Sequence, residues 1–115
     1  MENEMLVNFN DIGFAHSTIL AYNVSEDNVN LKLECWDGKI FEMNFIKYVS
    51  FFSTNYFSID DFQEVTESFL LERALDEFYE VRPKHHPFRI FKFLHDDITT
   101  LEIICEGFNM KEIKT

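Results

Sequence analysis

The sequence predicts an α+β domain in which one helix packs on a curved or partly closed antiparallel sheet of about five or six strands. Aromatic residues make up 17% of the chain, including fourteen Phe, and such side chains favour half-buried pleated surfaces. Extended segments and one helical segment follow in the order strand-strand-strand-helix-strand-strand, with the short connections typical of antiparallel neighbours. The 115 residues contain no repeat or linker, so residues 1–115 are expected to form a single domain.

The first strand is predicted over residues 17–24, where Leu20, Tyr22 and Val24 alternate on one face. A polar cluster at residues 25–28 predicts a turn, and residues 29–35 alternate again. A four-residue loop keeps the apolar faces of both strands together, as register requires. The resulting pairs are Val24 with Val29, Tyr22 with Leu31 and Leu20 with Leu33.

The register of the second hairpin follows from the requirement that the apolar residues of both strands face the same side of the sheet. A two-residue Asp-Gly loop would oppose Leu33 to Glu42, which sets an apolar face against a polar one. A three-residue loop at residues 36–38 restores the match, as a type I turn with Gly38 in the left-handed conformation. Trp36 is then expected at the turn, partly exposed. The pairs become Cys35 with Lys39, Leu33 with Phe41, Leu31 with Met43 and Val29 with Phe45.

The third strand is predicted from Ile40 to about Phe51. After Phe45 its apolar residues fall on both parities, so this part either is covered on both sides or bends. For residues 52–67 the pattern leaves strand, helix and loop open.

A helix is predicted over residues 69–79, because Ser68 is a favourable N-cap and apolar residues recur with helical spacing. Those residues are Leu71, Ala74, Leu75 and Phe78. After a connection that contains two prolines, residues 88–94 and 99–108 are predicted as the last two strands.

The net charge of −11 opposes binding to nucleic acid or to an anionic membrane and favours a basic partner. The charge is unevenly distributed: residues 60–80 carry a net −7, whereas residues 82–92 carry +4. Two interpretations stay open. Arg82 and Lys84 fold back onto the acids at the end of the helix, or these acids form a surface for a basic protein.

The histidine-containing segments do not indicate a metal site. His85 and His86 are adjacent in an extended segment and point to opposite sides. The run His95-Asp96-Asp97 resembles the paired His and Asp of metal phosphohydrolases, but it falls in a predicted turn, where Asp is common. The sequence also lacks a Gly-flanked Ser elbow and a Gly-rich phosphate loop. We therefore predict no enzyme, no cofactor and no metal site.

The expected compartment is the cytoplasm. The opening residues, MENEM, are acidic where a signal peptide would be basic, and no run of 18 apolar residues could span a membrane. Cys35 and Cys105 lie in apolar strands and are expected to be free core thiols. A disulfide between them stays open.

Four segments define an outline: HSTILAYNV and LKLECWDGKIFEMNF as an opening meander, SFLLERAL as the helix, and LEIICEGF as the closing strand. In this outline the chain resembles small acidic bacterial α+β proteins, some of which are immunity proteins that neutralise polymorphic toxins. The resemblance implies a non-enzymatic, cytoplasmic protein that binds a partner. It carries no catalytic or binding residue over to this chain.

The leading hypothesis is a protein-interaction module that binds a basic protein through an acidic surface, as an immunity or inhibitor protein does. Exposed aromatic residues ringed by acids would supply the affinity. The alternative is a domain that binds a small apolar ligand on the concave face of the sheet. A homodimer formed by the outer strands stays open. The candidate partner-binding residues are Trp36, Glu72, Asp76, Glu77, Tyr79 and Glu80.

Overall fold

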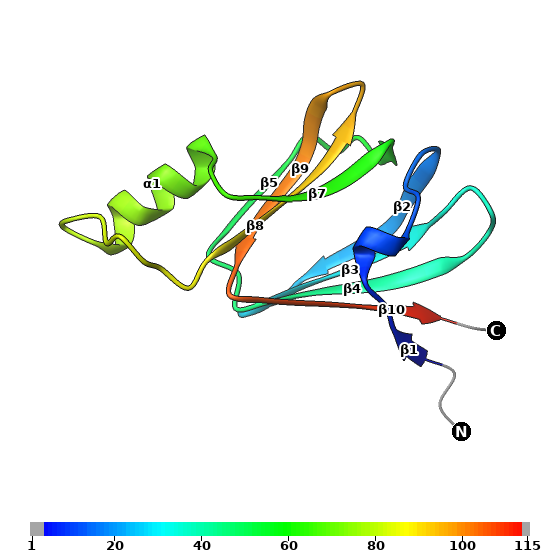
Figure 1. Ribbon diagram of the computed structural model, residues 1–115, viewed down its shortest axis with the longest axis horizontal. Coiled ribbons are helices and arrows are strands. Elements are labelled where there is room, and N and C mark those ends of the chain that lie inside the picture. Colours follow the sequence, from blue (N-terminus) through cyan, green and yellow to red (C-terminus); the bar gives the residue numbers. More distant parts are fainter. Residues whose placement is uncertain (1–3, 114–115) are drawn as a thin grey trace.

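The computed structural model describes residues 4–113 and contains one α-helix and two antiparallel sheets in that range (Figure 1). One sheet has six strands in the order β1-β10-β4-β3-β2-β6, and the other has four in the order β5-β9-β8-β7. Residues 1–3, part of the acidic opening segment, lie outside the described residues. The strands are β1 (Glu4–Leu6), β2 (Ser17–Val24), β3 (Asn28–Glu34), β4 (Ile40–Ile46), β5 (Ser50–Ser53), β6 (Ser58–Ile59), β7 (Asp61–Val65), β8 (Arg89–His95), β9 (Ile98–Cys105) and β10 (Gly107–Ile113), and the helices are the 3-10 turn η1 (Phe9–Asp11) and α1 (Phe69–Phe78).

The predicted β2–β3 hairpin is confirmed at its turn and wrong at its far end. Tyr22 pairs with Leu31 and Val24 with Val29, as parity predicts. The register then shifts between Ile19 and Ala21, so that Ile19, not Leu20, pairs with Leu33. Such a bulge adds one residue to one strand and reverses the facing of those beyond it. Ile19 is therefore buried and Leu20 is 48% exposed.

The predicted β3–β4 hairpin is confirmed throughout. The Cys35 amide donates to the Lys39 carbonyl at 2.9 Å, and Gly38 has φ +86°, the left-handed conformation that the three-residue loop requires. Trp36 at this turn is 70% exposed. The remaining pairs also agree with the prediction: Leu33 with Phe41, Leu31 with Met43 and Val29 with Phe45.

Four crossings between the two sheets explain why the predicted single sheet of five or six strands is wrong in detail. The chain enters the four-stranded sheet near Lys47 (φ +55°), returns between β5 and β6, enters it again at the corner at Asp60, and returns at the corner at Glu106. Each long predicted strand that meets a corner is divided there, and β1 and β10 were not anticipated. Residues 52–67, left open by the sequence, supply β6 and β7. Backbone hydrogen bonds continue through the corners, from Val49 to Ile104 (2.8 Å), Asp60 to Leu94 (2.7 Å) and Glu106 to Ile46 (3.0 Å).

Phenylalanine rings fill the space between the two sheets. Phe62 of β7 has six other Phe rings within 6.4 Å between centroids, mostly edge-on or tilted, which is the arrangement that aromatic pairs prefer. Full burial of each large apolar side chain contributes about 1.5–3 kcal/mol. This cluster is the main hydrophobic core.

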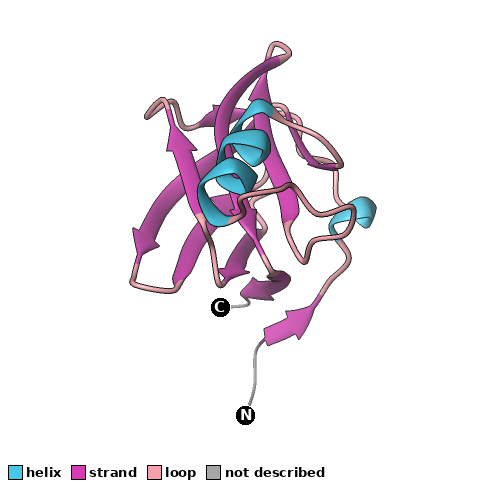
Figure 2. Ribbon diagram, turned by 90° about the vertical axis from the view of Figure 1, so that its left-hand side faces the viewer, coloured by secondary structure: helices cyan, strands magenta, loops and turns pink. Residues whose placement is uncertain are grey.

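Helix α1 begins as predicted and packs outside this core. The Ser68 hydroxyl oxygen accepts a hydrogen bond from the Leu71 amide at 3.0 Å, which satisfies one of the free amides of the first turn. Leu71 and Leu75 pack against Ile90 and Ile104, which alternate with core-facing residues of β8 and β9. Figure 2 shows α1 lying in front of the strands, on this outer face.

Candidate functional site

Exposed aromatic and aliphatic side chains surround the C-terminal end of α1, the left end of the molecule in Figure 1. Phe78 and Val81 are 57% and 83% exposed, and Tyr79 lies at the helix C-cap. Acidic residues are interspersed among them. We call this set the α1 surface: Glu77, Phe78, Tyr79, Glu80 and Val81.

Arg82 occupies part of the predicted acidic set. Its guanidinium donates two hydrogen bonds to the Asp76 carboxylate at 2.6 and 2.7 Å and approaches Glu72 at 3.4 Å. These hydrogen bonds hold the pKa of Asp76 below its ordinary value. The interpretation in which Arg82 folds back onto the helix is thus confirmed, whereas Lys84 makes no ion pair in the described part of the chain.

The acids that stay available are Glu77 and Glu80. Both are exposed, and neither forms an ion pair within residues 4–113. They lie at the end of a helix whose own dipole disfavours negative charge, with no basic residue in the last turn. These two carboxylates are thus exposed and without an ion pair in the described part of the chain.

Trp36 lies far from the other predicted binding residues. The turn that carries it joins β3 to β4 at the right-hand end of Figure 1, whereas α1 is at the left-hand end. The principal extents of the molecule are 48 × 36 × 24 Å. The structure therefore brings Glu72, Asp76, Glu77, Tyr79 and Glu80 together and leaves Trp36 at another surface.

The interior offers little support for the second hypothesis, an apolar ligand on the concave face. The neighbouring Phe45, Phe62 and Phe91 rings are fully or almost fully buried and touch one another. Phe93 and Phe108 extend the same cluster. These rings occupy the space that a ligand would need.

The two cysteines are free thiols in the core. Burial is the main cause that raises the pKa of both, and it raises the pKa of Cys105 to about 12. A thiol with a raised pKa is a poor nucleophile near neutral pH.

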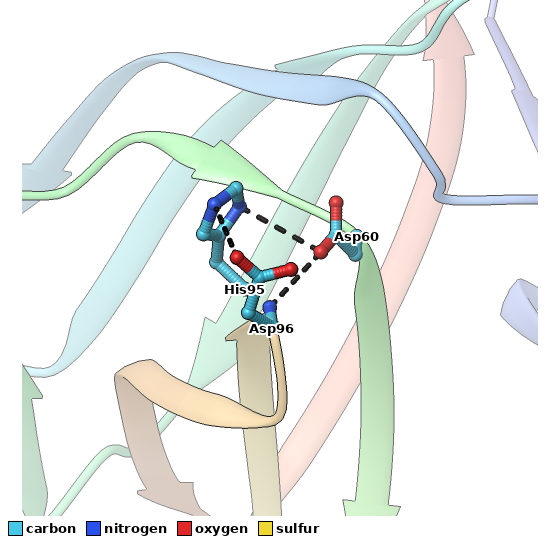
Figure 3. A group of neighbouring side chains, drawn as sticks. All are labelled: Asp60, His95 and Asp96. Atoms are coloured by element: carbon cyan, nitrogen blue, oxygen red, sulfur yellow. Dashed lines mark hydrogen bonds and ion pairs between the residues drawn. The ribbon is translucent and has the colours of Figure 1, made fainter.

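A second group of polar side chains lies where β8 ends and β6 passes into β7. Asp60, His95 and Asp96 each offer one potential ligand atom, and these atoms lie within 4.8 Å of one another (Figure 3). The His95 Nε2 is 3.4 Å from an Asp96 carboxylate oxygen, and its Nδ1 is 3.7 Å from Asp60 Oδ2. The Asp96 amide donates to the same Asp60 oxygen at 3.0 Å.

Tyr56 completes the surroundings of the imidazole. Its hydroxyl lies 3.3 Å from His95 Nε2, and the two rings meet edge to face with centroids 4.8 Å apart. The Tyr56 ring and hydroxyl thus hold one side of the imidazole, whereas Nδ1 has no hydrogen-bond partner among the described residues.

Sequence reasoning missed this cluster because it considered His95 only with its neighbours in the chain. Of the adjacent His85 and His86, the second contacts its own loop. The His86 Nδ1 accepts a hydrogen bond from the Phe88 amide at 3.2 Å, and its ring stacks on that of Phe88.

Comparison with known proteins finds no family model, no curated protein and no solved structure that matches the chain. Among the described residues, no helix has the length and apolar character needed to cross a membrane. The candidate function therefore rests on the surfaces described above.

Proposed function

We propose that this protein is a non-enzymatic interaction module that binds a basic protein through the α1 surface, as an inhibitor or immunity protein does. The observation that carries the proposal is the pairing of exposed apolar side chains with exposed acids that form no ion pair within residues 4–113, at the end of a helix. Phe78 and Val81 leave large apolar areas in water beside Glu77 and Glu80. Such patches with a polar rim are typical of protein-binding surfaces.

The two kinds of side chain have different tasks in this proposal. The apolar groups supply affinity once they are desolvated by the partner. The acids, together with the net charge of −11, attract a basic protein and accelerate its association. Asp76 and Glu72 act indirectly, because Arg82 already binds them.

The test compares two variants with the same net charge. In Glu77→Lys/Glu80→Lys the acids of the α1 surface are reversed, and in Asp11→Lys/Glu34→Lys two other exposed acids are reversed. The wild-type protein is first used to capture proteins from a lysate of its source organism, and both variants are treated in the same way. Association rates with any stoichiometric basic partner are then measured by surface plasmon resonance at low and high salt.

We expect the first variant to associate about tenfold more slowly at low salt and the second to associate nearly as fast as the wild type. The difference should shrink at high salt because exposed charges are screened. Equal rates for both variants would exclude the α1 surface as the binding site.

A further inference from the structure

We propose that Asp60, His95 and Asp96 bind a divalent transition-metal ion, with Zn²⁺ as the ion that fits best. This site is independent of the α1 surface and of the partner proposed above. It lies at the corner between β6 and β7, beside the β8–β9 turn.

The spacing of the donor atoms carries the proposal. Two ligands that are each about 2.0–2.1 Å from a tetrahedral zinc ion lie about 3.3–3.4 Å from one another. His95 Nδ1 and Asp60 Oδ2 are 3.7 Å apart, which is close to this spacing. Because one ligand atom of each of the three residues lies within 4.8 Å of the other two, Asp96 needs to approach by at most about 1.4 Å to complete the set.

The same imidazole nitrogen provides an independent observation. The Nδ1 atom of His95 is buried and has no hydrogen-bond partner among the described residues, although Asp60 Oδ2 is 3.7 Å away. A buried polar atom without a partner is destabilising. An ion held between Nδ1 and the Asp60 carboxylate would satisfy this nitrogen. Metal-ligating histidines have their other nitrogen held by a polar neighbour, which fixes the tautomer, and here the Tyr56 hydroxyl lies 3.3 Å from Nε2.

One backbone hydrogen bond and one bond from a backbone amide to a carboxylate hold the segments that carry the ligands. The Asp60 amide donates to the Leu94 carbonyl at 2.7 Å, and the Asp96 amide donates to Asp60. The Asp96 side chain is 81% exposed, so an ion can enter from solvent and keep water as a further ligand.

The donor set selects the kind of ion. An imidazole with two carboxylates suits Zn²⁺, Co²⁺ or Ni²⁺, whereas Ca²⁺ and Mg²⁺ prefer oxygen ligands alone. We therefore expect Zn²⁺ to bind in a ratio of one per chain and a millimolar excess of Mg²⁺ not to displace it.

The test uses the full chain after chelator treatment, with Zn²⁺ titrated by calorimetry and Co²⁺ followed by its visible absorption. The ligand variants are His95→Ala, Asp60→Asn and Asp96→Asn. The matched controls are His85→Ala and Asp97→Asn, an exposed histidine and an adjacent acid outside the cluster. Asp96→Asn changes an exposed side chain, so it stays informative even if the other two ligand variants fail to fold.

We expect each ligand variant to lose at least tenfold in zinc affinity and both controls to bind as the wild type does. Zinc at 100-fold above Kd should raise the Tm of the wild type by about 10 °C. Absence of zinc binding at 1 mM (roughly the weakest affinity that would still count as a site) would overturn the proposal. Binding that is unchanged in Asp96→Asn and His95→Ala would also overturn it.

Discussion

Truncation of Phe62 tests whether the interior is filled. Its side chain is almost fully buried and touches six rings, at centroid distances of 4.6 Å (Phe93), 5.1 Å (Phe9), 5.5 Å (Phe14), 5.6 Å (Phe108), 5.7 Å (Phe91) and 6.4 Å (Phe45). Phe62→Ala removes the whole ring from this cluster. Substitutions of this kind cost about 3–5 kcal/mol, and more where the surroundings cannot collapse.

We expect a loss of about 4 kcal/mol in the free energy of unfolding, because rigid rings from both sheets surround the site and relax little. This is a large share of the roughly 5–15 kcal/mol that a domain has in total. The assay is urea unfolding followed by far-UV circular dichroism, with an unchanged m-value as evidence that only stability changed. Phe62→Leu provides a milder variant if Phe62→Ala does not fold.

The control is Phe52→Ala, which removes the same side chain from β5, where it is 45% exposed. Its loss should stay below about 1 kcal/mol. A loss for Phe62→Ala below about 2 kcal/mol would refute the reasoning, since a ring beside an existing void has fewer contacts to lose. That result would also favour the second hypothesis, a domain with room for an apolar ligand.

Three further predictions concern local features. Ser68→Ala should lower the free energy of unfolding by about 1 kcal/mol, because the first turn of α1 loses its cap; an unchanged urea midpoint would contradict this role. Gly38→Ala should cost about 1 kcal/mol in the same assay, since φ is +86° while no atom lies within 4 Å of the added methyl group; Gly38→Asn should recover part of the loss. At pH 8, Cys35 and Cys105 should not react with a disulfide reagent in the native state, because burial raises both pKa values and keeps the thiols protonated; both should react in denaturant, and rapid native reaction would disprove their burial.

The parts of the fold that could be predicted are those set by local rules. Parity together with Gly38 determines the β3–β4 register, and Ser68 with the helical spacing of Leu71 and Leu75 determines α1. The bulge in β2 has no comparable signal. Ile19 and Leu20 are adjacent apolar residues, and only packing against the second sheet decides which of them faces inward.

The division into two sheets also depends on tertiary structure. A strand that turns a corner and a strand that continues have the same local pattern, as the residues around Glu106 illustrate. Glu102 shows a related effect: it lies on the outer face of its strand, as its parity predicts, yet it is only 7% exposed. The pattern predicts the direction of this side chain, whereas its burial depends on its cross-strand neighbours Phe52 and Lys92.

For the candidate sites, the net charge of residues 60–80 indicated that the end of α1 is acidic. It could not show which of these acids form ion pairs within the protein. Arg82 follows Asp76 by six residues, and the bend after the helix brings its guanidinium back onto that carboxylate. The acids that stay available could be identified only from this contact. Trp36 was grouped with them because it is aromatic and exposed, two properties that carry no information on position.

The Asp60–His95–Asp96 cluster was not predicted because the pairing of β7 with β8 was not known from the sequence. Strand β7 pairs with β8 so that Asp61 lies opposite Leu94. In an antiparallel ladder the next pair outward is Asp60 with His95, and Asp96 follows directly in the turn. Had residues 61–65 been recognised as the partner of residues 90–94, the sequence alone would have placed an aspartate against the histidine. A metal site between distant residues is thus predictable to the extent that strand pairing is, and no composition or local motif replaces that information.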